Sequence, residues 1–168
     1  MLRLARADAG HVALESRLFH LDEMLLETVQ AAVVLASQKE VAIEVSELSE
    51  GPFQGDEDLL RQMVMNLLDN AVKYTPPRGR VEVSLSSQNG SYAIRVSDTG
   101  CGIPEAARSH IFERFYRVEQ VRSQAAGAGL GLAIARWIAE IHSGTLELEQ
   151  STPEGSVFKA ILPRPPLT

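Results

Sequence analysis

The sequence predicts an α+β fold, a two-layer α/β sandwich in which about three helices cover one face of a mixed sheet of about five strands. Helical patterns and β-runs follow one another without strict βαβ alternation, which disfavours a doubly wound sheet. The 168 residues, 45% of them hydrophobic, suffice for one core but not for two ordinary domains. We expect one domain over residues 13–163, a leader over 1–12 and a tail over 164–168.

The first third of the chain begins with a helical pattern over residues 2–9 that lacks a recognisable start. An extended segment over 16–21 precedes a helix that continues through Ala36 and has one apolar face. The residues on that face are Met24, Leu25, Thr28, Val29, Ala32 and Leu35. Residues 41–45 alternate and predict a strand, which a turn at Gly51-Pro52 follows.

The next helix is predicted from its N-cap, Asp56, to about Tyr74, where Thr75-Pro76-Pro77 ends it. Two strands over 80–86 and 92–97 follow, and the Asn89-Gly90 pair between them is a strong hairpin signal.

After a glycine-rich loop, the small residues of 123–129 lead into a last helix that ends near His142. Residues 144–150 and 156–162 predict a final pair of strands.

The overall composition excludes several classes of protein. A net charge of -6 and a pI of about 5.2 disfavour direct nucleic-acid binding, which requires a surface that neutralises phosphates. No apolar run approaches the roughly 20 residues of a membrane span, so we expect no membrane contact from this chain. The single cysteine, Cys101, excludes an internal disulfide and a cysteine-rich metal site.

One edge of the helix over 56–74 is polar. Spacings of four and three place Asn66, Asn70 and Lys73 in one stripe beside an apolar arc, and the pattern predicts a buried Asn70 that needs a specific partner. The arc consists of Leu59, Leu60, Met63, Val64, Leu67 and Ala71. The partner is either the backbone of a neighbouring loop or a ligand, since amide oxygens can ligate Mg²⁺ and a nearby lysine can hold phosphate.

Two glycine-rich loops are candidates for nucleotide contact. Asp98-Thr-Gly-Cys-Gly-Ile-Pro104 follows an apolar strand, where the aspartate either caps a tight turn or accepts from an exocyclic amine such as that of adenine. Gly127-Ala-Gly-Leu-Gly131 opens the last helix, whose backbone N–H groups can receive phosphate oxygens. It is neither a dinucleotide fingerprint nor a Walker loop.

Four segments, in this order, resemble the four sequence boxes of the ATP-binding domain of bacterial sensor histidine kinases. They are Asn66-Leu-Leu-Asp-Asn-Ala-Val-Lys-Tyr-Thr75, Asp98-Thr-Gly-Cys-Gly-Ile103, Ile111-Phe-Glu-Arg-Phe-Tyr-Arg117 and Gly127-Ala-Gly-Leu-Gly-Leu132. The resemblance covers about residues 19–162 and implies the Bergerat-type sandwich of gyrase, chaperone and mismatch-repair ATPases.

The resemblance also implies a role for each matching residue. Asn66 and Asn70 match the Mg²⁺ and phosphate contacts, Lys73 a phosphate contact, Tyr74 a residue near the adenine or ribose, Asp98 the adenine selector, Gly100 and Gly102 the space for the base, Ile103 its pocket, Phe112 and Phe115 the aromatic anchors of a lid, Arg117 the lid cation at the γ-phosphate, Gly127, Gly129, Leu130 and Gly131 the phosphate loop, and Ser156 a hydroxyl near the adenine. Asn66, Lys73 and Arg117 are the implied catalytic groups. Ala128 replaces a common hydroxyl residue, so only backbone contacts to phosphate are implied there.

The resemblance implies partners outside this chain. Residues 2–10 resemble the end of a dimerisation and phosphoacceptor helix, but no histidine has the sequence context of a phosphoacceptor; the four are His11, His20, His110 and His142. The acceptor would therefore lie on the parent's own dimerisation domain, and phosphate would pass on to the receiver domain of a response regulator. Relatives of this kind are often the cytoplasmic part of an inner-membrane sensor.

Two other functions stay open at the level of sequence. A Bergerat-type ATPase or serine kinase usually has glutamate four residues before the magnesium asparagine, where this chain has Asn66. A nucleotide-binding or interaction module that has lost catalysis would still keep these boxes.

Overall fold

The computed structural model describes residues 13–116 and 130–164 and confirms the predicted two-layer α+β architecture. The elements are β1 (Arg17–His20), α2 (Leu21–Gln38), β2 (Ala42–Leu48), β3 (Pro52–Gly55), α3 (Glu57–Tyr74), β4 (Arg80–Gln88), β5 (Ser91–Asp98), a short 3₁₀ helix (Glu105–Ala107), α4 (Gly131–Ile141), β6 (Thr145–Thr152) and β7 (Gly155–Pro163). The predicted leader over 1–12, residues 165–168 of the predicted tail over 164–168, and the stretch 117–129 lie outside the described residues.

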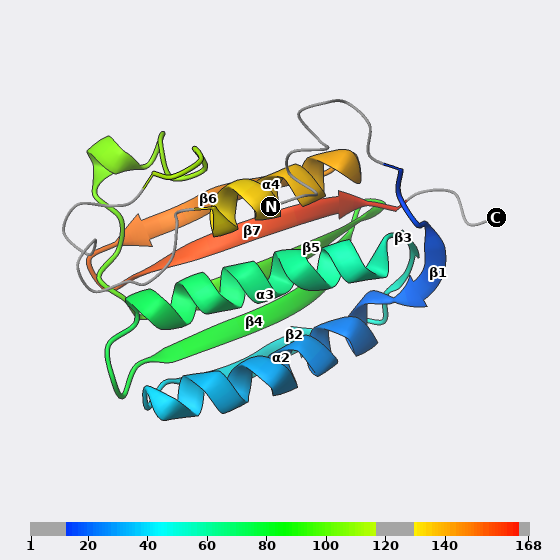
Figure 1. The fold of residues 1–168 in the computed structure, drawn as a ribbon. Helices are drawn as coiled ribbons and strands as arrows, with labels where there is room; N and C mark the ends of the chain where they lie inside the picture. Colours follow the sequence, from blue (N-terminus) through cyan, green and yellow to red (C-terminus); the bar gives the residue numbers. More distant parts are fainter. Residues whose placement is uncertain (1–12, 117–129, 165–168) are drawn as a thin grey trace.

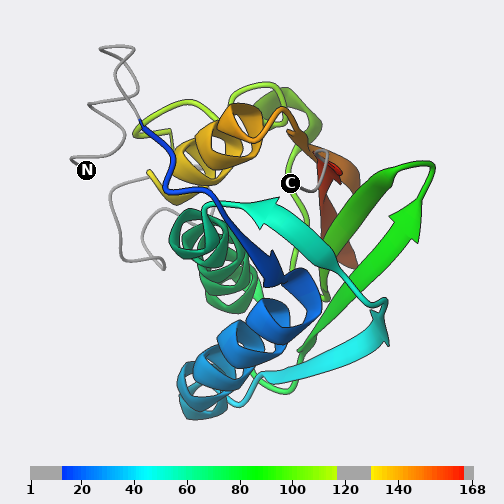
Figure 2. The same cartoon turned by 90° about the vertical axis from the view of Figure 1, so that its right-hand side faces the viewer.

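The main sheet has five strands in the order β2-β4-β5-β7-β6 and is mixed. β2 pairs with β4 in parallel, and the other three pairings are antiparallel. Helices α2, α3 and α4 lie side by side on one face of this sheet (Figure 1), and the view turned by 90° shows the two layers edge on (Figure 2).

A second, two-stranded sheet differs from the prediction. The extended segment over 16–21 contains β1, but the expected turn at Gly51-Pro52 leads straight into β3, which pairs antiparallel with β1. Phe53 packs edge-on against Tyr92 at a centroid distance of 6.2 Å, and the Tyr92 hydroxyl donates to the Pro52 carbonyl over 3.0 Å. These contacts tie the small sheet to β5.

The core lies between the helices and the sheet, with α3 in the centre. The whole predicted apolar arc of α3 is buried. The face predicted for the helix over 21–38 is also buried, with the exception of Leu35, which is 57% exposed in the last turn of α2.

Two local predictions are confirmed by backbone geometry. The Asp56 carboxylate caps α3 by accepting from the backbone N–H of Leu59 at 3.1 Å. Asn89 and Gly90 both have positive φ, 51° and 77°, as the tight hairpin between β4 and β5 requires. Over the described residues, no helix is both long and apolar enough to cross a membrane.

Candidate functional site

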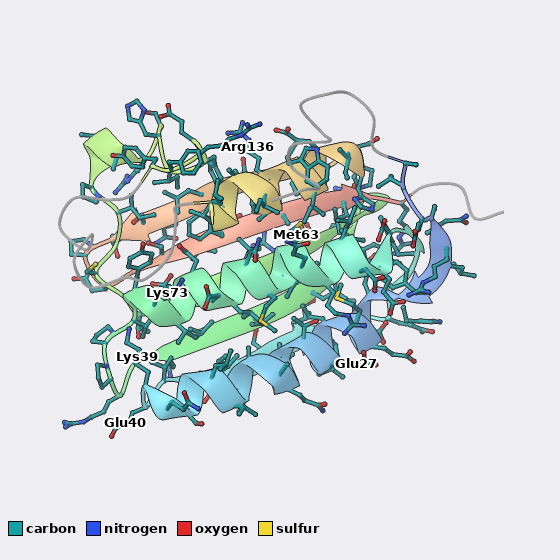
Figure 3. The ribbon with its side chains drawn as sticks, in the orientation of Figure 1. Glu27, Lys39, Glu40, Met63, Lys73 and Arg136 are labelled. Carbon is teal, nitrogen blue, oxygen red and sulfur yellow. The ribbon has the colours of Figure 1, made fainter. Side chains whose placement is uncertain are left out.

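The polar edge of α3 faces the start of α4. The amide nitrogen of Asn66 donates to the Gly131 carbonyl over 3.2 Å, which brings the first and the last of the four boxes together. About two turns further along α3, the Lys73 ammonium (Figure 3) lies 3.0 Å from the Asp69 carboxylate. The spacing of the stripe therefore places the Asn66 amide and the Lys73 cation on the same edge of α3, with Asn66 at the start of α4.

Asn70, between them, is half-buried, so the prediction of a buried amide is wrong. Helix α4 begins opposite Asn66, and Asn70 lies one turn further along α3, past the start of α4. Among the described residues the Asn70 amide has no hydrogen-bond partner. The hydrogen bond from Asn66 to Gly131 uses the amide nitrogen, and the Asn66 oxygen has no partner among these residues. Two available neutral oxygens on one helix edge suit a hard cation such as Mg²⁺.

Asp98 ends β5 and is only 8% exposed. Burial raises the pKa of Asp98, and hydrogen bonds from the backbone N–H groups of Gly100 and Ser156 partly oppose this shift. The Gly100 N–H lies 2.8 Å from the carboxylate. A Cβ on Gly100 would lie 2.5 Å from the Tyr74 carbonyl, so glycine lets the Asp98 loop pack against the end of α3.

The second glycine of this loop fixes its other side. Gly102 has a φ of 78°, and a Cβ there would lie 2.1 Å from the Thr152 carbonyl of β6. The N–H of Ile103 donates to the Ser151 hydroxyl over 2.8 Å, and that hydroxyl lies 3.0 Å from the hydroxyl of Ser156. Ser156 thus lies beside the Asp98 loop at Ile103.

Sequence reasoning missed two residues that hold this loop. Ser151 receives the Ile103 N–H, and the Arg108 guanidinium donates to the carbonyls of Ile103 and Ser151, each at 3.0 Å. The register of the β6–β7 hairpin, which places Ser151 opposite Ser156, is the signal that would have identified Ser151. Arg108 has no comparable signal, because its contacts depend on the path of the loop.

The two predicted aromatic anchors behave differently. Phe112 is half-buried and packs edge-on against Phe158 at 6.1 Å, with the Arg136 guanidinium over its ring at 5.1 Å (Figure 3). Phe115 is 64% exposed and has a positive φ of 64°, so it does not make the packing contact that its role as an anchor implies. Phe112 thus fastens this segment to β7 and α4, and the neighbouring Ile111 is buried in the core.

The phosphate loop is described only at its end. Leu130 is half-buried and forms the N-cap of α4, which begins at the exposed Gly131. Arg117, Gly127 and Gly129 lie outside the described residues, so their predicted roles remain predictions.

Other metal and thiol chemistry has little support. Across 13–116 and 130–164, no three histidine, cysteine or acidic side chains are grouped as a metal site. Cys101 is exposed and free.

The chain matches the family model described as histidine kinase-, DNA gyrase B- and HSP90-like ATPase over residues 55–166. It is 39% identical over 166 residues to the sensor histidine kinase RppB of Synechocystis sp., covering 97% of this chain and 36% of that protein. It is 34% identical over 167 residues to the circadian input-output histidine kinase CikA of Synechococcus elongatus, covering 97% and 22%. The chain therefore spans about a fifth to a third of the length of these relatives.

Solved structures are similar over most of the chain. A mycobacterial sensor histidine kinase, MprB, superposes with a TM-score of 0.77 and 32% identity, covering 90% of this chain and all of that one. Full-length ShkA in complex with AMPPNP superposes with a TM-score of 0.85 and 29% identity, covering 99% of this chain and 35% of that one.

Proposed function

Because this chain belongs to the histidine kinase-, DNA gyrase B- and HSP90-like ATPase family, we propose that it positions Mg-ATP for transfer of the γ-phosphoryl group to a histidine on a separate domain. The chain is the ATP-binding catalytic domain of a sensor histidine kinase. The observation that best supports the proposed site is the convergence of the Asp98 loop on the end of α3, whose Asn66 in turn contacts the start of α4.

The adenine end of the proposed site is the Asp98 loop. Burial disfavours the charged form of the Asp98 carboxylate and raises its pKa, so an N–H group of a bound base would stabilise that charged form by a hydrogen bond. Adenine carries such an N–H in its exocyclic amine, next to flat apolar surface. Gly100 and Gly102 let this loop close against the carbonyls of Tyr74 and Thr152. Ile103 and Ser156 lie around the same loop, both bonded to the Ser151 hydroxyl.

The phosphate end is assigned to the polar edge of α3. Asn66 and Asn70 would hold Mg²⁺, which when bound neutralises phosphate charge and orients the γ-phosphoryl group. Lys73 would contact a phosphate oxygen in place of Asp69, its present partner. Leu130, Gly131 and the preceding Gly127 and Gly129 would offer backbone N–H groups to the phosphates, and Arg117 a lid cation.

Phosphoryl transfer depends mostly on positioning and on electrostatic stabilisation, and this domain would supply both. Phe112 is fastened to β7 and α4, so the segment that follows it starts from a fixed point beside the site. The acceptor imidazole would come from the parent's dimerisation domain, and the phosphoryl group would pass to an aspartate of a response regulator. We place this chain in the cytoplasmic part of its parent, where ATP and the regulator are found.

The test is to mix the chain with the parent's separately produced dimerisation domain and γ-phosphate-labelled ATP. Acid-labile, base-stable label on that domain is the expected result. Phosphate release without labelled protein would instead favour a Bergerat-type ATPase. AMPPNP binding without either product would favour an interaction module that has lost catalysis.

A further inference from the structure

His142 connects the two helices that carry the phosphate end of the site. It follows α4 directly, and its Nε2 accepts from the backbone N–H of Asp56, the N-cap of α3, at 3.0 Å. Its Nδ1 lies 2.8 Å from the Ile138 carbonyl. An acceptor at Nε2 and a donor at Nδ1 together require the neutral tautomer with the proton on Nδ1.

The environment of the ring favours this neutral form. Burial lowers the pKa of His142, while the hydrogen bond to Ile138 and the charge of Asp56 partly oppose the shift. Asp56 is the charged group that faces the ring from α3; β3 presents the uncharged Phe53 and Gly55, and α4 presents the Ile138 carbonyl.

The ring also has little freedom to move. The centroids of the His142 and Phe53 rings are 6.4 Å apart, and a Cβ on Gly55 would lie 2.9 Å from Cδ2 of His142. Glycine at position 55 therefore admits the imidazole against β3. The Asp56 carboxylate is turned to other donors, the N–H groups of Leu59 and Glu15.

The contact between His142 and the Asp56 N–H has a counterpart at the other end of α4. The Asn66 amide meets the Gly131 carbonyl there. Asp56 and Asn66 are separated by about 15 Å of α3, and His142 and Gly131 by about 17 Å of α4, at 1.5 Å of rise per residue. α4 is thus attached to α3 at two points, with matching lengths of helix between them.

We propose that neutral His142 is a positioning residue, which holds the nucleotide-binding edges of α3 and α4 at the spacing that ATP requires. This inference rests on the proposed function. Protonation would place a second donor at Nε2 opposite the Asp56 N–H and break the contact. Nucleotide binding and protonation of His142 would therefore oppose each other, and by reciprocity bound nucleotide must lower the pKa of His142.

The direct test is an NMR titration of the His142 imidazole in the intact chain, with and without saturating Mg-AMPPNP. We expect the Nδ1-protonated tautomer in both states and a lower pKa of His142 in the complex. The His20 ring, which lies near Asp22 at the start of α2, is the internal control. An unchanged pKa of His142 in the saturated complex would overturn the inference.

Two variants distinguish positioning of the nucleotide site by His142 from general stabilisation of the fold. His142→Gln keeps an acceptor for the Asp56 N–H but does not titrate, whereas His142→Leu has no acceptor. By calorimetry at neutral pH we expect the Kd of Mg-AMPPNP to stay within about twofold for His142→Gln and to rise roughly fivefold for His142→Leu, as the loss of one hydrogen bond predicts.

The pH dependence of the affinity for Mg-AMPPNP gives the second readout. On acidification, affinity should fall more steeply in the native chain than in His142→Gln; both keep Asp98, so their difference isolates His142. Parallel profiles would overturn the inference, even if His142→Leu failed to fold. Absence of binding by the native chain would instead remove the proposed function, and this inference with it.

Discussion

Asp98 and Ser156 are direct partners in the ladder between β5 and β7. Strand β7 therefore brings a backbone N–H to the carboxylate assigned to the adenine, while the Ser156 hydroxyl bonds to the hydroxyl of Ser151. Gly155 permits this approach, because a Cβ there would lie 1.9 Å from the Asp98 carbonyl. The proposed adenine end is a property of the sheet rather than of one loop.

Gly102 should be intolerant of a side chain. Gly102→Ala combines a positive φ with a Cβ 2.1 Å from the Thr152 carbonyl, so we expect a loss of about 3 kcal/mol of unfolding free energy. Gly90→Ala is the matched control, since Gly90 has a similar φ of 77° but no atom within 4 Å of the added Cβ, and about 1 kcal/mol is expected. Equal losses in urea denaturation would contradict the steric explanation.

Asn66 should matter for Mg²⁺-dependent affinity. Asn66→Ala removes the proposed metal ligand, and we expect Mg-AMPPNP to bind about tenfold more weakly. Gln62→Ala, one turn earlier on the same edge of α3, should bind as the native chain does. The difference in AMPPNP affinity between the two variants should shrink when EDTA replaces Mg²⁺. If Asn66→Ala bound AMPPNP as much more weakly in EDTA as in Mg²⁺, the metal assignment would be contradicted.

Asp69 should compete with ATP for Lys73. The carboxylate holds the ammonium at 3.0 Å and also repels phosphate, so Asp69→Asn should tighten Mg-AMPPNP binding by about threefold. Lys73→Met should weaken it. Titration microcalorimetry at low and high salt measures both effects, which should decrease as salt rises. Weaker binding by Asp69→Asn would instead show that the ion pair between Asp69 and Lys73 is needed for nucleotide binding.

Stability should depend on pH through His142. Its folded pKa lies below the ordinary 6.5, so its stabilising contribution is complete above about pH 6.5 and is lost as the pH falls through the folded value. Glu149 has a folded pKa below its ordinary 4.5, set first by its hydrogen bond from Arg95, so its contribution is lost only at lower pH.

Denaturation at a series of pH values distinguishes these two contributions. His142→Gln should flatten the fall in unfolding free energy that begins just below pH 6.5, while Glu149→Gln should leave that part unchanged. A fall of the same steepness in His142→Gln and the native chain would assign this pH dependence to other groups.

Local signals in the sequence predicted much of the fold. Asp56 caps α3 and Asn89-Gly90 closes the hairpin because both features depend on a few adjacent residues. The pairing of β1 with β3 was missed because it joins segments that are far apart in sequence, and a short run such as β3 has no period of its own.

The site was predicted in outline for a similar reason. Helical spacing aligned Asn66, Asn70 and Lys73, but it could not indicate that α4 begins opposite Asn66 and leaves Asn70 past its start, so Asn70 was wrongly expected to be buried. The contacts of Arg108 and His142 depend on tertiary packing between distant elements. No pattern along the chain reports such contacts.

The most direct test of the central claim is calorimetric titration of the chain with Mg-AMPPNP, beside Asp98→Asn and the exposed control Asp58→Asn. We expect the native chain and Asp58→Asn to bind alike and Asp98→Asn to lose binding. Asp98→Asn should remain folded, because the amide keeps an oxygen that can accept from the Gly100 N–H. Failure of the native chain to bind, or undiminished binding by folded Asp98→Asn, would contradict the proposed nucleotide site.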